Sequence, residues 1–252
     1  MKKSYKKSYR RKPKIPFYKK SFFWKLLAFV VLFFVLIYVT VFCEFFWIKN
    51  INISGNELVD QKRVLDVVNN SINAKSIFLV NRVIIKDNIL NEFPEVYLVN
   101  VRRDFPGTLV VNVMERNAIA TWCDSSLESC FLIDKDGFLF KKTEPKNMVL
   151  ISSNGSFNLE DTAIDPEKLS ELNNLWQEIK DVGVYWFEIN GSEIVAHTFD
   201  NWDIKFTFNN LLSSQARVLR IILEKEIIED DLEYIDVRFE NRAYLKSSTQ
   251  GS

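Results

Sequence analysis

Few side chains in this chain of 252 residues have the chemistry that catalysis requires. The only histidine, His197, lies in a run that reads as a strand, and any Ser-His-Asp arrangement would have to use it. Asp134 and Asp136 are close in sequence, but a turn at Gly137 explains both without an acid–base pair. The sequence has no glycine-rich phosphate loop and no G-x-S-x-G nucleophile motif. We therefore expect a protein that is not an enzyme and has no catalytic, cofactor-binding or metal-binding residue; a hydrolase that uses His197 is the enzymatic alternative.

Cys123 and Cys130 are the residue pair whose spacing indicates covalent chemistry. They flank a polar hexapeptide between two runs that read as strands, so their Cβ atoms could face each other across a hairpin. In an oxidising compartment they would bond, and closing this eight-residue loop would add about 2.5 kcal/mol of stability on the chain-entropy model. Two free buried thiols are the alternative. Zinc is not expected, because no second pair of ligands accompanies them.

The segment from Leu26 to Cys43 contains eighteen residues and no charge. As a helix it would span about 27 Å, close to the hydrocarbon thickness of a bilayer. Residues 1–25 carry eleven Lys/Arg and no Asp or Glu, an excess that keeps this end in the cytoplasm. The exit at Phe42 lacks the small residues of a signal-peptide cleavage site, which favours an uncleaved anchor. A buried helix of a soluble domain is the alternative, but it leaves the one-sided charge unexplained.

The rest of the chain is acidic. Residues 26–252 hold 22 Lys/Arg and 33 Asp/Glu, a net charge of −11. This charge argues against binding nucleic acid or anionic lipid in the outer part. The basic tail could touch inner-membrane lipid or act only as a topology signal, and its composition predicts disorder. We expect a single-pass protein of the inner membrane, with its N-terminus in the cytoplasm and most of the chain outside.

Hydrophobic periodicity predicts two units in the outer part. In the first, a strand, two helices and two strands are expected at 48–54, 60–69, 80–93, 96–105 and 108–115. Asp60 is the predicted cap of the first helix, and Pro94 ends the second. This order predicts two helices on a three-stranded sheet.

The second unit combines short strands with two amphipathic helices. The expected elements are a hairpin at 130–140, a strand at 148–151, a helix at 166–183, strands at 184–190, 193–199 and 202–208, a helix at 211–228 and a strand at 234–239. Asp165 is the predicted cap of the first helix. Asp236 and Arg238 project to one face of the last strand, and we expect Arg238 to meet a carboxylate of the adjacent strand rather than a partner.

At several places the chain resembles the FtsQ/DivIB family of cell-division proteins. The matching segments are F-W-I-x-x-I-x-I-x-G-N from Phe46 to Asn56, Phe93-Pro94-x-Val96, the Pro-Gly-Thr-Leu hairpin of Arg103 to Leu109, Glu115-Arg116-x-x-x-Ala120-x-Trp122, and the Y-I-D-x-R-F run that ends at Phe239. The chain departs from the family pattern at Asn117-Ala118, where a Pro is common, and at Arg242, where a Gly is usual.

This resemblance implies the division of the chain. The expected class is α+β, with one N-terminal transmembrane helix, a POTRA domain in the order β-α-α-β-β, and a mixed β-sheet domain with two helices. The expected segments are a basic disordered cytoplasmic tail at 1–21, the transmembrane helix at 22–44, the POTRA domain at 45–116, the FtsQ-type β domain at 117–246 and a disordered tail at 247–252.

The resemblance also implies a function by binding. Family members are divisome scaffolds with one membrane span, which recruit and hold FtsB-like and FtsL-like single-pass proteins at the division septum. No nucleic acid, small-molecule substrate or cofactor is expected. A POTRA-bearing envelope transport or assembly factor is the alternative function.

The last strand is the expected binding site, because an edge strand leaves a row of N–H and C=O groups for a partner strand. We predict this edge at 239–245. The residues expected on its partner-binding face are Phe239, Asn241, Ala243 and Leu245. Phe239 matches the partner-contacting aromatic residue of the family, whereas Tyr244 has the opposite parity on a regular strand.

Overall fold

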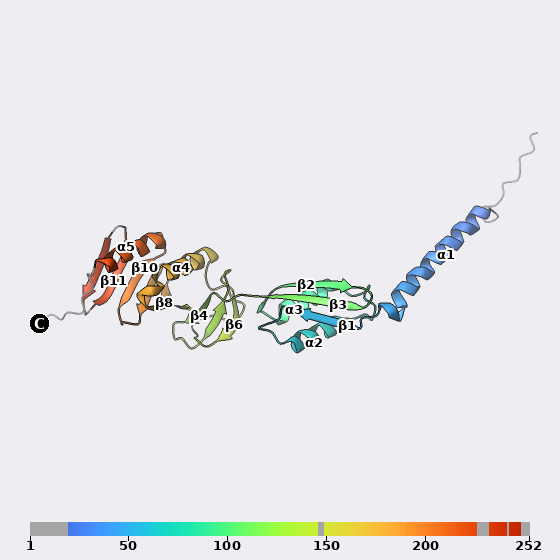
Figure 1. Ribbon diagram of the computed structural model, residues 1–252, viewed down its shortest axis with the longest axis horizontal. Helices are drawn as coiled ribbons and strands as arrows, with labels where there is room; N and C mark the ends of the chain where they lie inside the picture. The colour runs from blue at the N-terminus through green and yellow to red at the C-terminus, as the bar shows by residue number, and fades with distance from the viewer. Residues whose placement is uncertain (1–19, 146–148, 226–231, 241, 248–252) are drawn as a thin grey trace, which may run out of the picture.

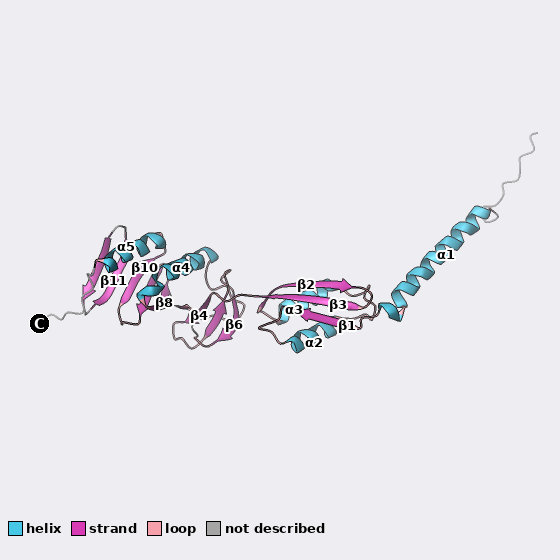
Figure 2. Ribbon diagram, in the orientation of Figure 1, coloured by secondary structure: helices cyan, strands magenta, loops and turns pink. Residues whose placement is uncertain are grey.

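A computed structural model of the protein describes residues 20–145, 149–225, 232–240 and 242–247. The tails predicted to be disordered lie almost entirely outside these residues. Figure 1 shows a helix at one end, a small unit of helices and strands next to it, and a larger unit at the far end. The predicted α+β class is confirmed, with helices and strands mixed in both folded units (Figure 2).

The N-terminal helix, α1 (Ser21–Phe42), is 22 residues long, and nearly all of its described apolar side chains are exposed. Its segment Ser21–Val39 is long and apolar enough to cross a membrane. A short 3₁₀ turn, η2 (Glu44–Phe46), follows the helix and leads into the first folded unit.

The first unit packs two helices on a three-stranded sheet, as predicted. Its elements are β1 (Asn50–Ser54), α2 (Gln61–Ser71), α3 (Arg82–Glu92), β2 (Val96–Asp104) and β3 (Thr108–Glu115). The sheet order is β1-β3-β2, with β1 parallel and β2 antiparallel to β3. Asp60 caps α2 as predicted, by accepting a hydrogen bond from the backbone N–H of Lys62. Asn81 caps α3 in the same way, so this helix begins two residues later than predicted.

Glu115 and Gly55 hold β1 beside β3. The Glu115 carboxylate accepts hydrogen bonds from three backbone N–H groups, those of Glu57, Leu58 and Val59, at 2.7–3.0 Å. Gly55 has a φ of +84°, and a Cβ there would lie 2.1 Å from the carbonyl oxygen of Val113. Only glycine fits this close approach, which explains the Gly-Asn pair that ends the first strand.

The second unit contains one mixed nine-stranded sheet. Its elements are β4 (Ala120–Asp124), β5 (Cys130–Ile133), β6 (Leu139–Thr143), β7 (Leu150–Ser153), α4 (Pro166–Ile179), η3 (Lys180–Val182), β8 (Val184–Asn190), β9 (Glu193–Thr198), β10 (Asp203–Thr207), α5 (Leu212–Glu224), β11 (Leu232–Phe239) and β12 (Arg242–Ser247). The strand order is β12-β11-β10-β9-β8-β7-β4-β5-β6. Neighbouring strands are parallel at β4–β7, β7–β8 and β10–β11, and antiparallel elsewhere.

Helices α4 and α5 supply the crossovers that parallel neighbours require, since α4 lies between β7 and β8 and α5 between β10 and β11. The apolar faces of both helices join one core with the sheet. Among its buried members are Leu172 of α4, Leu219 of α5, Phe187 of β8, Phe206 of β10 and Ile235 of β11. The two crossovers and this shared core therefore account for the strand order of the sheet from β7 to β11.

Arg116 joins the two units. Its backbone N–H donates to the carbonyl oxygen of Glu95, and its Nε donates to that of Pro94. Both acceptors lie between α3 and β2 of the first unit. Its Nη1 lies 2.5 Å from Oδ2 of Asp134 in the second unit, and its guanidinium stacks 4.1 Å above the ring of Phe138. Asp134 also accepts hydrogen bonds from the backbone of its own turn, which is the turn role predicted for it.

Arg116→Ala should lower the free energy of unfolding of the second unit by about 3 kcal/mol, because it leaves a buried carboxylate without its cation. The Asp134 side chain is only 5% exposed. Urea unfolding of the full chain, followed by tryptophan fluorescence, measures the loss. The matched control is Lys135→Ala, whose ion pair with Asp136 is exposed and should contribute little to stability. Equal losses in the two variants would contradict the role of Arg116.

Candidate partner-binding edge of the C-terminal sheet

The site begins with the hairpin of β11 and β12. β12 is antiparallel to β11, with Tyr234 opposite Lys246, Ile235 opposite Leu245 and Asp236 opposite Tyr244. β11 is itself held by parallel pairing to β10. Within the part of the chain that the structure describes, β12 is the outermost strand at this end of the sheet. Its outer side is therefore an edge.

The prediction of one continuous edge strand from Phe239 to Leu245 is wrong. Phe239 is the last residue of β11 and pairs with Arg242, so the chain reverses between them, with Glu240 in a turn. Asn241, a residue type that favours turns, lies outside the described residues. Phe239 consequently belongs to the penultimate strand, and Ala243 and Leu245 belong to the edge strand.

The reversal changes which side chains meet. Phe239 and Tyr244 pack edge to face with their ring centroids 5.1 Å apart, and 48% of Phe239 remains exposed. Leu245 is also exposed, whereas Ala243 is partly buried against the core. Tyr244 therefore contacts Phe239, although alternation on a regular strand would place the two side chains on opposite faces. A hairpin in place of a regular strand accounts for the difference.

A cavity of about 360 Å³ opens between the start of α5 and the turn after β11. Leu211, Val218 and Phe239 give it an apolar wall, and Glu240 and Asn209 add polar groups. The backbone beside it is already satisfied, because the buried side chain of Gln215 bonds to both the N–H and the C=O of Thr207. The cavity is therefore a preformed space beside the edge that an apolar side chain of a partner could fill.

Charged groups fix β11 behind the edge. Asp236 accepts hydrogen bonds from Nε and Nη2 of Arg238 at 2.9 and 2.7 Å, and Nη1 of Arg238 reaches Glu193 of β9 at 2.5 Å. Arg238 therefore pairs with carboxylates, but neither lies on an adjacent strand as predicted, because Asp236 belongs to β11 itself and Glu193 to β9, beyond β10. Burial by itself would raise the pKa of Asp236, but the hydrogen bonds from Arg238 outweigh it and hold that pKa below the ordinary value.

Arg238→Met should destabilise the protein most at neutral pH. A carboxyl with a depressed pKa contributes stability above its unfolded pKa of about 3.9 and loses it as pH falls through the lower folded value. In the variant, Asp236 stays buried but loses the guanidinium. The difference in free energy of unfolding from wild type should therefore be largest near about pH 7 and shrink in acid. Urea titrations across this range test it, with exposed Arg242→Met as control; a gap independent of pH would show that Arg238 acts through packing alone.

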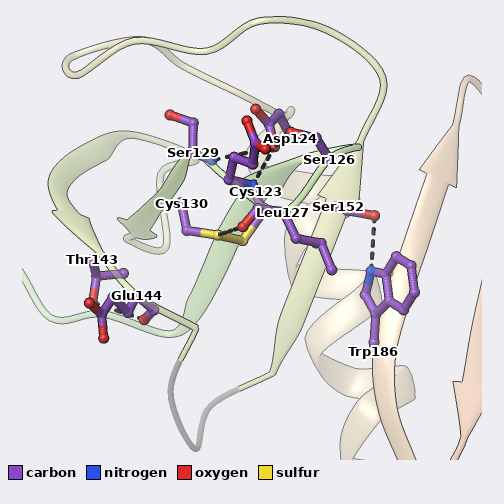
Figure 3. Close-up of a disulfide and its surroundings, with 11 residues drawn as sticks. Cys123, Asp124, Ser126, Leu127, Ser129, Cys130, Thr143, Glu144, Ser152 and Trp186 are labelled. Atoms are coloured by element: carbon purple, nitrogen blue, oxygen red, sulfur yellow. Dashed lines mark hydrogen bonds between the residues drawn. A yellow bond between two sulfur atoms is a disulfide. The ribbon is translucent and has the colours of Figure 1, made fainter.

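Cys123 and Cys130 lie far from this edge. β4 and β5 pair them directly, and a disulfide joins them (Figure 3). The loop that they close is held by Asp124, whose carboxylate accepts hydrogen bonds from the hydroxyl of Ser126 and the backbone N–H of Glu128. Because β4 is six strands away from β12, this bond stabilises the sheet rather than forming part of the edge.

Export of the protein to an oxidising compartment should leave one reactive thiol per chain. Cys43 is free and serves as an internal control for alkylation. After non-reducing denaturation we expect mass spectrometry to find one alkylated cysteine, and after reduction three. Three alkylated cysteines before reduction would show that the Cys123–Cys130 bond does not form in the cell.

His197 has partners that adjacent residues in the sequence did not indicate. Its ring stacks on Trp186 at 4.4 Å, and Nδ1 lies 2.8 Å from Oδ1 of Asp203 on the neighbouring strand. Nε2 is 3.5 Å from Glu188, too far for a good hydrogen bond. Among the described residues, no group of three His, Cys, Asp or Glu side chains is placed to hold a metal ion. The contacts with Trp186 and Asp203 hold the His197 ring in one orientation against the sheet.

Comparison with known proteins agrees with this architecture. Residues 46–116 match the family model of the POTRA domain, FtsQ-type. The chain is 27% identical over 207 residues to the cell division protein DivIB of Clostridium acetobutylicum, which covers 77% of this chain and 80% of that protein. It is 35% identical over 103 residues to the cell division protein FtsQ of Rickettsia bellii, covering 40% of this chain and 36% of that protein. With its apolar N-terminal helix, its FtsQ-type POTRA match at residues 46–116 and its mixed C-terminal sheet, the chain is similar to the FtsQ/DivIB cell-division proteins.

Proposed function

We propose that this protein is a non-catalytic scaffold of the division machinery, which holds single-pass partner proteins by pairing a partner strand with β12. The observation that carries the proposal is the position of β12 at the end of the nine-stranded sheet, with exposed apolar side chains beside it. A division-related role follows from the relatives. The partner and the mode of binding are the proposed part.

The two ends of this sheet differ in a way that favours β12. At the other end, the segment after residue 157 covers β6: the N–H of Leu139 donates to the C=O of Asp161, and the N–H of Glu160 donates to the C=O of Leu139. At β12, no described strand or loop forms such a ladder on the outer side. An uncovered edge can accept a partner strand through its main chain, while pockets for alternate side chains provide selectivity.

The chemistry of the edge defines the partner. An added strand would lie beside Tyr244 and Leu245, and an apolar side chain at its end would reach the cavity that Phe239 and Leu211 line. Arg242 is exposed at the start of β12 and favours an acidic residue on the partner. The family resemblance implies FtsB-like and FtsL-like proteins as the source of such a segment.

The membrane arrangement supports the same proposal. We infer that α1 spans the inner membrane with its N-terminus in the cytoplasm, because eleven Lys/Arg precede it. Both folded units then lie outside the cytoplasm, where a disulfide can form and where single-pass division proteins expose their own segments. At the septum, the edge would hold these partners without chemical conversion.

Phe239→Lys should weaken binding to the FtsB-like protein of the same organism roughly tenfold or more, because burying an exposed Phe contributes about 1.5–3 kcal/mol. Phe199→Lys is the matched control: Phe199 is 72% exposed in the same unit, after β9, and its replacement should not change binding. Affinity is measured with both full-length proteins in detergent, and circular dichroism checks the fold.

Unchanged affinity in Phe239→Lys would contradict binding at this edge. Imaging of a fluorescent fusion tests the function independently. A midcell band is the expected result, whereas uniform distribution over the envelope would contradict a septal scaffold and favour a transport or assembly factor.

A further inference from the structure

The segment that leaves the membrane helix is part of the first folded unit. The carbonyl oxygen of Phe46 accepts a hydrogen bond from the N–H of Ile77, and the N–H of Ile48 donates to the C=O of Lys75, each at 2.9 Å. On the other side, the N–H of Lys49 donates to the C=O of Gly107 at 2.8 Å. A Cβ at Gly107 would lie 2.3 Å from the carbonyl oxygen of Trp47, so the turn can approach only because it has glycine there.

This pairing leaves almost no tether between the helix and the unit. α1 ends at Phe42 and the first hydrogen bond into the unit is made at Phe46, with the 3₁₀ turn η2 between them. At about 2 Å of rise per residue, the three residues of this turn span roughly 6 Å. The polar headgroup layer of a bilayer is also about 5–8 Å thick on each side. With α1 across the membrane as proposed above, the near end of the first unit therefore lies within reach of the headgroups.

Aromatic side chains from three separate segments gather at this end. The ring centroid of Phe46 is 5.1 Å from those of Phe45 and Phe78, and Phe78 is 5.2 Å from Phe105. Phe45 and Phe105 are more than half exposed, and Leu79 beside Phe78 is 57% exposed. An apolar patch of this kind on a soluble domain marks an interaction surface, and aromatic rings favour the membrane interface.

The same end is basic, although the outer part as a whole is acidic. The segments 43–50, 72–82 and 102–108 carry five Lys/Arg against Glu44 and Asp104, a net charge of +3. Two of the cations, Lys49 and Lys75, line a cavity of about 510 Å³ next to Trp47 and Ile72. The Nζ of Lys75 lies 4.9 Å from the centre of a Trp47 ring, so the ammonium is placed over an aromatic face that lines the cavity.

We propose that this membrane-facing end of the first unit is a lipid-docking surface. The rings of Phe45, Phe78 and Phe105 enter the interface of the leaflet on the side of the folded units, and Lys49 and Lys75 bind the phosphate of anionic phospholipid headgroups. The occupant is the bilayer itself, because the short connection permits no other large partner between helix and unit. Docking fixes the angle at which the unit stands on the membrane and makes that angle sensitive to anionic lipid.

The test uses the full-length protein in lipid nanodiscs of phosphatidylcholine, with or without phosphatidylglycerol. A nitroxide is attached at position 79 through Leu79→Cys in a Cys43→Ser background, under conditions that keep the disulfide. Its accessibility to oxygen, which partitions into lipid, is compared with its accessibility to an aqueous nickel chelate. We expect headgroup depth at position 79, and aqueous exposure for the same label at Phe199→Cys in the second unit.

The charge requirement is tested by the double replacement of Lys49 and Lys75 with Gln. In discs with phosphatidylglycerol it should lower the ratio of docked to undocked chains roughly 30-fold, since two interfacial cations are lost, and in phosphatidylcholine alone it should have little effect. Exposed Lys142→Gln is the control and should behave as wild type. The proposal is overturned if the label at position 79 is as exposed to the nickel chelate as that at position 199, or if the double replacement acts equally in both lipids.

Discussion

The contact between Arg116 and Asp134 is the constraint on which the arrangement of the molecule depends. It lies where the first unit ends and the second begins, and the guanidinium also meets the carbonyl oxygen of Pro94 and the ring of Phe138. Glu115, the preceding residue, closes the loop after β1. One dipeptide therefore completes the first unit and sets the direction of the second. The position of the far sheet edge relative to the first unit follows from these contacts.

Within the second unit, strand order and charge pairing both determine the structure of the last two strands, β11 and β12. The crossovers through α4 and α5 leave β12 outermost, and the Asp236–Arg238–Glu193 network holds β11, the strand that β12 needs as its template. The disulfide lies six strands away and stabilises the opposite part of the sheet. A rigid neighbour behind an uncovered edge is what binding by strand addition requires, because ordering the edge on binding would cost affinity.

Features set by neighbouring residues could be predicted from the sequence. The caps at Asp60 and Asp165, the two-unit division and the α+β class all depend on local chemistry and periodicity. Contacts between distant residues could not be predicted in this way. Arg116 reaches Asp134 across 18 positions, and His197 meets Asp203 only because β9 and β10 pair. The edge was misplaced because the polar run Glu240 to Arg242 fits either an exposed stretch of one strand or a tight turn, and only the pairing of Phe239 with Arg242 distinguishes them.

The segment that follows α1 is hydrogen-bonded on both sides to the first unit, through Phe46 and Ile48 on one side and Lys49 on the other. It therefore connects the helix closely to that unit. A helix tilts more in a thin bilayer than in a thick one, because its apolar length must match the hydrocarbon. On the proposed membrane arrangement, the short connection would pass a change in tilt to an undocked first unit, and Arg116 would pass it on to the second unit. On the same proposal, bilayer thickness would influence how high above the membrane a partner at β12 is held.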